Sequence, residues 1–151
     1  VGLRRRPGPA PRPGIEVVTA LPDLLTAADH VVLAAPATPE THHLLDAAAF
    51  AAMKPGVHVV NVSRGSLVDQ DALLAALDAG QVARASLDTV EPEPLPAGHP
   101  LYAHPGVRLS PHVSWSAPGS IMQTFAHFYE NMRAHRAGRP LAGVVDTAAG
   151  Y

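Results

Sequence analysis

The sequence predicts an α/β fold: a parallel sheet with helices on both of its faces. The first observation is a set of short β-branched apolar runs, of which residues 57–62 (Val-His-Val-Val-Asn-Val) are the clearest. A run that is apolar at nearly every position is typical of a strand buried on both faces of a parallel sheet. The second observation is that helical patterns separate these runs. This alternation predicts βαβ units and therefore a parallel sheet.

Composition limits the classes of function. The chain has 151 residues, of which 47% are hydrophobic, and this is enough for one domain with a real core. Its net charge of -2 gives no basic field, so we expect no nucleic-acid partner. There is no cysteine, which excludes disulfides and thiolate chemistry and fits a cytoplasmic protein. No apolar run approaches the length of a membrane span and no signal peptide is visible, so we expect no membrane association.

The first third of the chain alternates short strands with one short helix. Residues 1–3 and 15–18 are predicted strands, and the proline-rich stretch 7–14 between them is a loop. A short helix is predicted over residues 22–28, with Pro22 in its first turn, where a missing N–H does no harm. Residues 30–35 form the next buried strand.

The middle of the chain holds the best capping signals. Asp46 is placed to cap a helix that runs through Met53, before the strand at 57–62. Asp69 is placed to cap a second helix, which ends before Gly80 and has Leu73, Leu74 and Leu77 on one face.

The last part of the chain combines two strands with the longest helix. Strands are predicted at 82–88 and 107–109, with a long proline-rich loop over 89–104. The final helix is predicted to start with Ser116 as its cap and Pro118 in its first turn, and to close at Gly138. Its apolar face is either core or interface, since these residues fall at helical spacing: Ile121, Phe125, Phe128, Tyr129 and Met132.

Four predicted strands end in turns with distinctive chemistry, and the first of these strands, at 30–35, ends at Ala35-Pro-Ala-Thr-Pro-Glu-Thr41. Arg64 follows the strand at 57–62, Asp88 ends the strand at 82–88 and leads into Glu91 and Glu93, and His112 follows the strand at 107–109. Ligands of open α/β sheets bind outside the carboxyl ends of the strands. Arginine gives a bidentate grip on a carboxylate, and a histidine paired with a carboxylate can donate a proton near neutral pH. The set suits proton transfer at a carbonyl next to a carboxylate, as in a 2-keto acid reductase.

Four segments in register resemble the D-isomer-specific 2-hydroxyacid dehydrogenases. They are Asn61-Val-Ser-Arg-Gly65, Leu87-Asp-Thr-Val-Glu-Pro-Glu-Pro94, Ser110-Pro-His-Val-Ser114 and Ala35-Pro-Ala-Thr-Pro-Glu-Thr41. The resemblance implies a Rossmann-type NAD(P)-binding domain and reversible hydride transfer between a nicotinamide and a 2-keto or 2-hydroxy acid.

The resemblance also implies a role for individual residues. Arg64 would hold the substrate carboxylate, His112 would be the general acid and base, and Glu93 would pair with His112. Asp88 would meet the nicotinamide carboxamide, and Ser114 would lie near the nicotinamide. The cofactor would be lined further, largely through backbone, by Ala35, Pro36, Val62 and Ser63.

Two departures from the family pattern bear on the cofactor. No G-x-G-x-x-G turn occurs in the chain, so we expect it to begin inside the cofactor domain, with a hole in the sheet where that fold has a central strand. The family's NAD-type members carry an acidic residue at the end of the second strand, where this chain has Arg4 and Arg5. Guanidinium groups suit a 2′-phosphate, so NADP is preferred over NAD.

Simpler interpretations stand beside these. Arg64 also fits a solvated residue at the start of the next helix, Asp88 a turn cap, and Arg4 and Arg5 an exposed basic chain end. Only the family register selects Glu93 over Glu91. His42 and His43 have no partner at metal-binding spacing, so no metal site is predicted.

We therefore expect residues 1–116 to form a partial cofactor domain, and residues 117–151 to be a helix and tail that pack toward a substrate domain. The leading hypothesis is part of an NAD(P)-dependent 2-hydroxyacid dehydrogenase that forms a homodimer and acts on a small 2-keto or 2-hydroxy acid. A nucleotide-sensing or corepressor-like interaction protein and an inactive truncated product are the alternatives.

Overall fold

The chain is divided into two compact units. The computed structural model describes residues 1–5, 7–10 and 12–148. One unit runs from Val1 to Pro111 and the other begins at His112, whereas the sequence analysis drew its boundary after residue 116. Residues 149–151 of the expected C-terminal segment lie outside the described residues. Within the described residues, the strands and the first three α-helices belong to the first unit, and the last α-helix belongs to the second.

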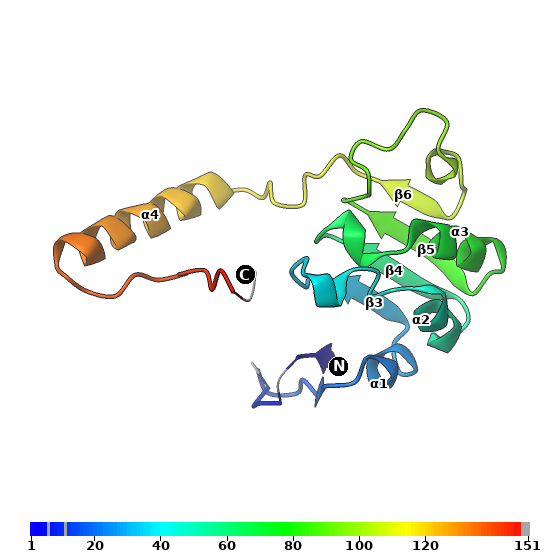
Figure 1. Ribbon diagram of the computed structural model, residues 1–151, viewed down its shortest axis with the longest axis horizontal. Helices are drawn as coiled ribbons and strands as arrows, with labels where there is room; N and C mark the ends of the chain where they lie inside the picture. Colours follow the sequence, from blue (N-terminus) through cyan, green and yellow to red (C-terminus); the bar gives the residue numbers. More distant parts are fainter. Residues whose placement is uncertain (6, 11, 149–151) are drawn as a thin grey trace. The chain divides into compact units, whose positions relative to one another are not determined.

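Two parallel sheets form the first unit (Figure 1). The smaller sheet pairs β1 (Gly2–Leu3) with β2 (Val17–Val18). The larger sheet has four strands in chain order, which are β3 (His30–Leu33), β4 (Val57–Asn61), β5 (Val82–Leu87) and β6 (Val107–Leu109). Among the described residues no strand pair joins the two sheets, so β1 and β3 each lie at an edge. This agrees with the expected hole in the sheet.

Three short helices build the core on one face of the larger sheet. They are α1 (Leu21–Leu25), α2 (Ala47–Ala52) and α3 (Gln70–Asp78), with α2 in contact with both of the others. The predicted caps are confirmed: Asp46 accepts a hydrogen bond from the Ala49 N–H at 2.8 Å, and Asp69 accepts one from the Ala72 N–H at 3.0 Å. The helices bury a common cluster against the strands: Leu25, Val31, Phe50, Val59, Leu73, Leu77 and Leu87.

The larger sheet is buried more deeply on the helical face than on the other. Val31 and Leu33 of β3 are 2% and 5% exposed, whereas Val32 between them is 60% exposed. In β4, buried and half-buried positions alternate. The strands were expected to be buried on both faces. Full burial is found only on the face that α1, α2 and α3 cover.

The second unit contains α4 (Ser120–Arg136), which begins later than predicted. Gly119 precedes the helix with φ at +87°, a left-handed conformation that ends the preceding turn, so Ser116 and Pro118 lie before the helix and not in it. The expected apolar face is present, but it is not core: Ile121, Phe125, Phe128, Tyr129 and Met132 are 49–62% exposed. Among the described residues, no helix combines the length and apolar character needed to cross a bilayer.

Candidate active site at the strand ends

Parallel register brings the ends of the four strands to one edge of the sheet (Figure 1). Leu33 pairs with Asn61, Asn61 with Leu87, and Leu87 with Leu109. The residues that follow these positions therefore gather at the carboxyl edge of the larger sheet, where open α/β sheets bind ligands.

Asn61 organises the turn after β4. Its side chain is buried, it donates to the Arg64 carbonyl at 2.8 Å, and it accepts from the Ser63 N–H at 3.0 Å. The Ser63 hydroxyl in turn donates to the Ala35 carbonyl, which lies in the turn after β3. Two of the expected cofactor-lining residues, Ala35 and Ser63, are thus held together, while the expected neighbours Pro36 and Val62 are exposed next to them.

Arg64 lies at the edge of the sheet with an exposed guanidinium. Its backbone is extended, with φ at -140°, and a short 3₁₀ turn, Gly65–Leu67, follows it before α3 begins. The Arg64 Nη1 donates to the Ser63 carbonyl at 2.7 Å. The residue is therefore part of the turn and not the first residue of the α-helix, and its remaining donors are available to an anionic ligand.

Gly65 brings this turn against the loop that carries Glu91 and Glu93. A Cβ atom at Gly65 would lie 2.1 Å from both the carbonyl carbon and the oxygen of Val90. No side chain fits in that space, so the close approach of the two loops depends on the glycine.

Asp88 connects the ends of three strands. It is 6% exposed, its N–H donates to the Asn61 carbonyl at 2.9 Å, and its carboxylate accepts from the Ser110 hydroxyl. A buried carboxylate at the carboxyl edge of a sheet is a fixed polar group that a ligand amide can meet.

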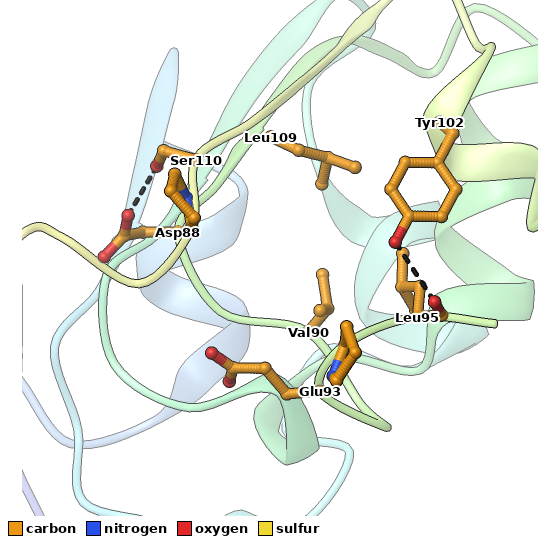
Figure 2. A pocket seen from close by; sticks show the side chains of 9 residues that line it. Asp88, Val90, Glu93, Leu95, Tyr102, Leu109 and Ser110 are labelled. Carbon is orange, nitrogen blue, oxygen red and sulfur yellow. Dashed lines mark hydrogen bonds between the residues drawn. The ribbon is translucent and has the colours of Figure 1, made fainter. Parts of the chain in front are cut away.

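A pocket of about 440 Å³ opens beside Asp88 (Figure 2). Figure 2 shows the hydrogen-bonded pair Asp88 and Ser110 on one side of the pocket and Tyr102 on the other. The Tyr102 hydroxyl donates a hydrogen bond to the Leu95 carbonyl at 3.1 Å. Glu93 lines this pocket and Glu91 does not. The full lining consists of Asp88, Val90, Glu93, Pro94, Leu95, Tyr102, Leu109, Ser110 and Pro111.

Sequence reasoning missed two contributors to this pocket, Leu95 and Tyr102. Both lie in the long loop after β5, where proline and glycine break any hydrophobic period. Tyr102 belongs to a 3₁₀ turn, Pro100–Tyr102, that the sequence analysis did not predict. The His99 side chain caps this turn by accepting from the Leu101 N–H, and Pro100, a common turn residue, was the available signal.

His112 and Ser114 belong to the second unit. His112 has φ at +53°, and its carbonyl accepts a hydrogen bond from the Trp115 Nε1 at 3.0 Å. A left-handed backbone is uncommon in a residue other than glycine and is enriched at functional positions. His112 follows Pro111, which lines the pocket, directly in the chain.

Arg4 and Arg5 follow β1, with exposed side chains. The Arg4 N–H donates to the Val18 carbonyl at 3.0 Å, so the smaller sheet fixes the backbone at this point. The pKa of Glu40 lies below its ordinary value, chiefly through the Thr38 side-chain hydrogen bond, then through the backbone of Glu40, and last through attraction to Arg5. Arg5 is thus within electrostatic reach of the loop after β3.

Comparison with known proteins points to one family. The profile of the family described as "D-isomer specific 2-hydroxyacid dehydrogenase, NAD binding domain" matches residues 4–114. A glyoxylate/hydroxypyruvate reductase A from Serratia proteamaculans is 42% identical over 117 residues, which are 77% of this chain. The match spans only 36% of that relative's length.

Solved structures are similar over nearly the whole chain. A D-isomer specific 2-hydroxyacid dehydrogenase from Xanthobacter autotrophicus, in complex with NADPH and MES, is 38% identical with a TM-score of 0.89, over 99% of this chain and 62% of that one. An NADPH-dependent glyoxylate/hydroxypyruvate reductase from Sinorhizobium meliloti, in complex with NADP and sulfate, is 31% identical with a TM-score of 0.90, over 99% of this chain and 48% of that one. With the family profile matched over most of its length, the chain belongs to the D-isomer-specific 2-hydroxyacid dehydrogenases.

Proposed function

We propose that the chain is the cofactor-binding part of an NADP(H)-dependent reductase of small 2-keto acids. One observation carries the proposal: the Arg64 turn, buried Asp88 and the pocket lined by Glu93 all lie at the carboxyl edge of one parallel sheet. The relatives named as glyoxylate/hydroxypyruvate reductases support the choice of glyoxylate and hydroxypyruvate as substrates.

The proposed roles follow from the chemistry of each group. Arg64 binds the substrate carboxylate, because its planar guanidinium can form two parallel hydrogen bonds to it. His112 donates a proton to the substrate oxygen during reduction and removes it during oxidation. Glu93 pairs with His112, as the family resemblance implies, and a carboxylate paired with a histidine is a common acid–base arrangement.

The residues present suit the two ends of the cofactor. Asp88 meets the nicotinamide carboxamide, with its carboxylate already held by Ser110. Arg4 and Arg5 suit the 2′-phosphate that distinguishes NADP from NAD, and Ser63 lines the cofactor between them. When bound, the cofactor supplies or accepts the hydride.

Cofactor choice is tested by titrating the 151-residue chain with NADPH and with NADH. The double variant Arg4→Ser/Arg5→Ser should bind NADPH about tenfold or more weakly, because the charge-assisted contacts to the 2′-phosphate are lost, and NADH with unchanged affinity. An equal change for both cofactors would refute the role of the two arginines.

The catalytic assignment is tested by glyoxylate and hydroxypyruvate reduction in the protein that carries this chain. His112→Ala should lower turnover by about 10²–10⁴-fold, the usual contribution of a placed acid–base group. His127→Ala, an exposed histidine of α4, is the matched control and should leave turnover unchanged. Full activity in the His112 variant would remove this residue from the mechanism.

A second candidate function is a corepressor-like binding role, which the exposed apolar face of α4 favours. Its signature is NADPH binding without reduction of either 2-keto acid.

We also propose a homodimer, as the family resemblance implies. The measurement is the molar mass of the chain by sedimentation equilibrium over a range of concentrations. A monomer mass at every concentration would exclude the homodimer.

A further inference from the structure

Three metal-ligating side chains lie together outside the strand-end site. His42, His43 and Glu91 each offer a ligand atom, and these three atoms lie within 4.8 Å of one another. All three side chains are exposed. The two histidines follow the 3₁₀ turn Pro39–Thr41, and Glu91 lies in the loop after β5. The sequence spacing of His42 and His43 does not show this third ligand, because the fold supplies it from a distant loop.

The backbone beneath the cluster is fixed on both sides. The His43 N–H donates to the Ser66 carbonyl at 2.8 Å, and the Leu45 N–H donates to the Leu67 carbonyl at 3.0 Å. The Glu91 N–H donates to the Gln70 side chain at 3.3 Å, and the same side chain donates back to the Glu91 carbonyl. These hydrogen bonds hold the backbone of both loops in place, so the three side chains start from fixed positions.

The surroundings favour a cation. The cluster borders a cavity of about 430 Å³ that also has Asp69, Asp71 and His99 in its wall, and no lysine or arginine lines it. The three carboxylates in this wall, those of Asp69, Asp71 and Glu91, attract a divalent ion. The Asp69 Oδ2 lies 3.9 Å from the His43 Nδ1, while its Oδ1 caps α3. At this distance the Asp69 carboxylate adds negative charge beside the His43 ring without a hydrogen bond to it.

The ligand types select the class of ion. Two imidazoles and one carboxylate suit Zn²⁺ and other divalent transition metals, whereas Mg²⁺ and Ca²⁺ prefer oxygen ligands alone. Three protein ligands with an open fourth position are a common zinc arrangement, in which ligand atoms lie about 3.3 Å apart. In the structure the His42 and His43 rings stack with centroids 4.0 Å apart, so one ring must rotate for both to reach one ion.

We propose that His42, His43 and Glu91 bind a divalent transition-metal ion, with Zn²⁺ as the test ion. Such an ion joins the loop after β3 to the loop after β5. Because Glu91 lies two positions before Glu93, the ion would also hold the segment that lines the 440 Å³ pocket. The proposal does not depend on the proposed reductase function.

The test is calorimetric titration of the metal-stripped 151-residue chain with ZnCl₂. The unmodified chain should bind one Zn²⁺, and excess MgCl₂ should not compete. His43→Gln and Glu91→Gln should each weaken binding by about tenfold or more, since each removes a ligand. His127→Gln on α4 is the matched control and should bind as the unmodified chain does.

Two results would overturn the proposal. One is an affinity for Zn²⁺ that survives both ligand variants or falls equally in the His127 control. The other comes from a Co²⁺ titration of the unmodified chain, which does not depend on any variant: a spectrum of six-coordinate aqueous Co²⁺ alone contradicts a His₂Glu site. Intense visible bands of four- or five-coordinate Co²⁺ support it. Neither measurement involves nicotinamide, so their outcome is separate from that of the proposed reductase.

Discussion

Two small residues determine how the loops of the candidate site meet. Asn61 donates one hydrogen bond and accepts another inside the turn after β4, and Gly65 lets this turn touch the backbone of Val90. Neither residue is expected to touch the substrate. Both decide where Arg64 and Glu93 are held, so their effects should appear first in stability.

Gly65→Ala should destabilise the chain by about 1–3 kcal/mol, the usual range for forcing extra atoms into a packed site. The added Cβ would lie 2.1 Å from Val90 backbone atoms, which cannot rotate away. The measurement is urea unfolding followed by circular dichroism. Gly8→Ala is the control, because a Cβ there meets only the Arg4 side chain, at 3.7 Å. Equal stability of the two variants would contradict the close packing at Gly65.

Asp29 should make stability depend on pH through its pair with Lys54. The Lys54 Nζ donates to the Asp29 carboxylate at 2.9 Å, and this hydrogen bond first and the lysine charge second lower the pKa of Asp29. A lowered pKa adds stability above the ordinary aspartate pKa of about 3.9, and this stability is lost as the pH falls through the lowered value.

The measurement for this pair is the thermal midpoint of the unmodified chain and of Asp29→Asn, from neutral pH to about pH 2. The unmodified chain should be slightly more stable at neutral pH, and the difference should vanish in acid. Lys54→Gln should remove the same pH-dependent contribution to the stability of the chain. A difference that persists at the lowest pH would show that the aspartate acts by another route.

At the scale of single elements, α3 is the helix most tightly bound to the core. Leu73→Ala should cost about 2–5 kcal/mol, because the side chain is fully buried and its loss leaves a cavity. Leu74→Ala is the matched comparison on the same helix, since Leu74 is only partly buried, and its cost should be smaller. Denaturant unfolding of both variants measures the difference. Similar costs would mean that the helix face is assigned wrongly.

Local sequence signals were sufficient to predict most helices and strands. Capping aspartates located α2 and α3, and β-branched runs located β3 and β4, because these signals act within a few residues. The start of α4 was predicted too early: Ser116 and Pro118 suit a helix start, but the left-handed Gly119 delays the helix to Ser120. The exposure of Val32 and of the α4 face was not predictable either, since apolar side chains do not reveal which neighbours cover them.

The candidate site was predictable where it follows strand ends and not where it depends on packing between loops. Arg64 and Asp88 were found because each lies in the turn that follows a buried strand. Tyr102 in the pocket wall and Glu91 beside His42 and His43 were not, because both reach their places through the path of a long loop with no regular period.

At the scale of the whole molecule, the division after Pro111 predicts where proteolysis begins. Residues 112–119 contain no helix or strand, and Trp115 among them is 63% exposed. Brief chymotrypsin treatment should cut first after Trp115, because unstructured exposed segments are preferred sites, and mass spectrometry identifies the product. Trp115→Ala should delay this cut. A first cut after Tyr102, which is 56% exposed but lies in a 3₁₀ turn, would contradict the division.

The chain of hydrogen bonds along the strand ends has a consequence for the thermodynamics of recognition. Ser63, Asp88 and Ser110 each use a backbone N–H or hydroxyl to hold the neighbouring strand end, before any ligand arrives. These three residues lie at the carboxyl edge of the larger sheet, and their conformations are already restricted. A small molecule that binds there therefore pays little additional conformational entropy for ordering them. Because this edge of the sheet is preorganised, selectivity between ligands depends on the side chains that extend beyond it.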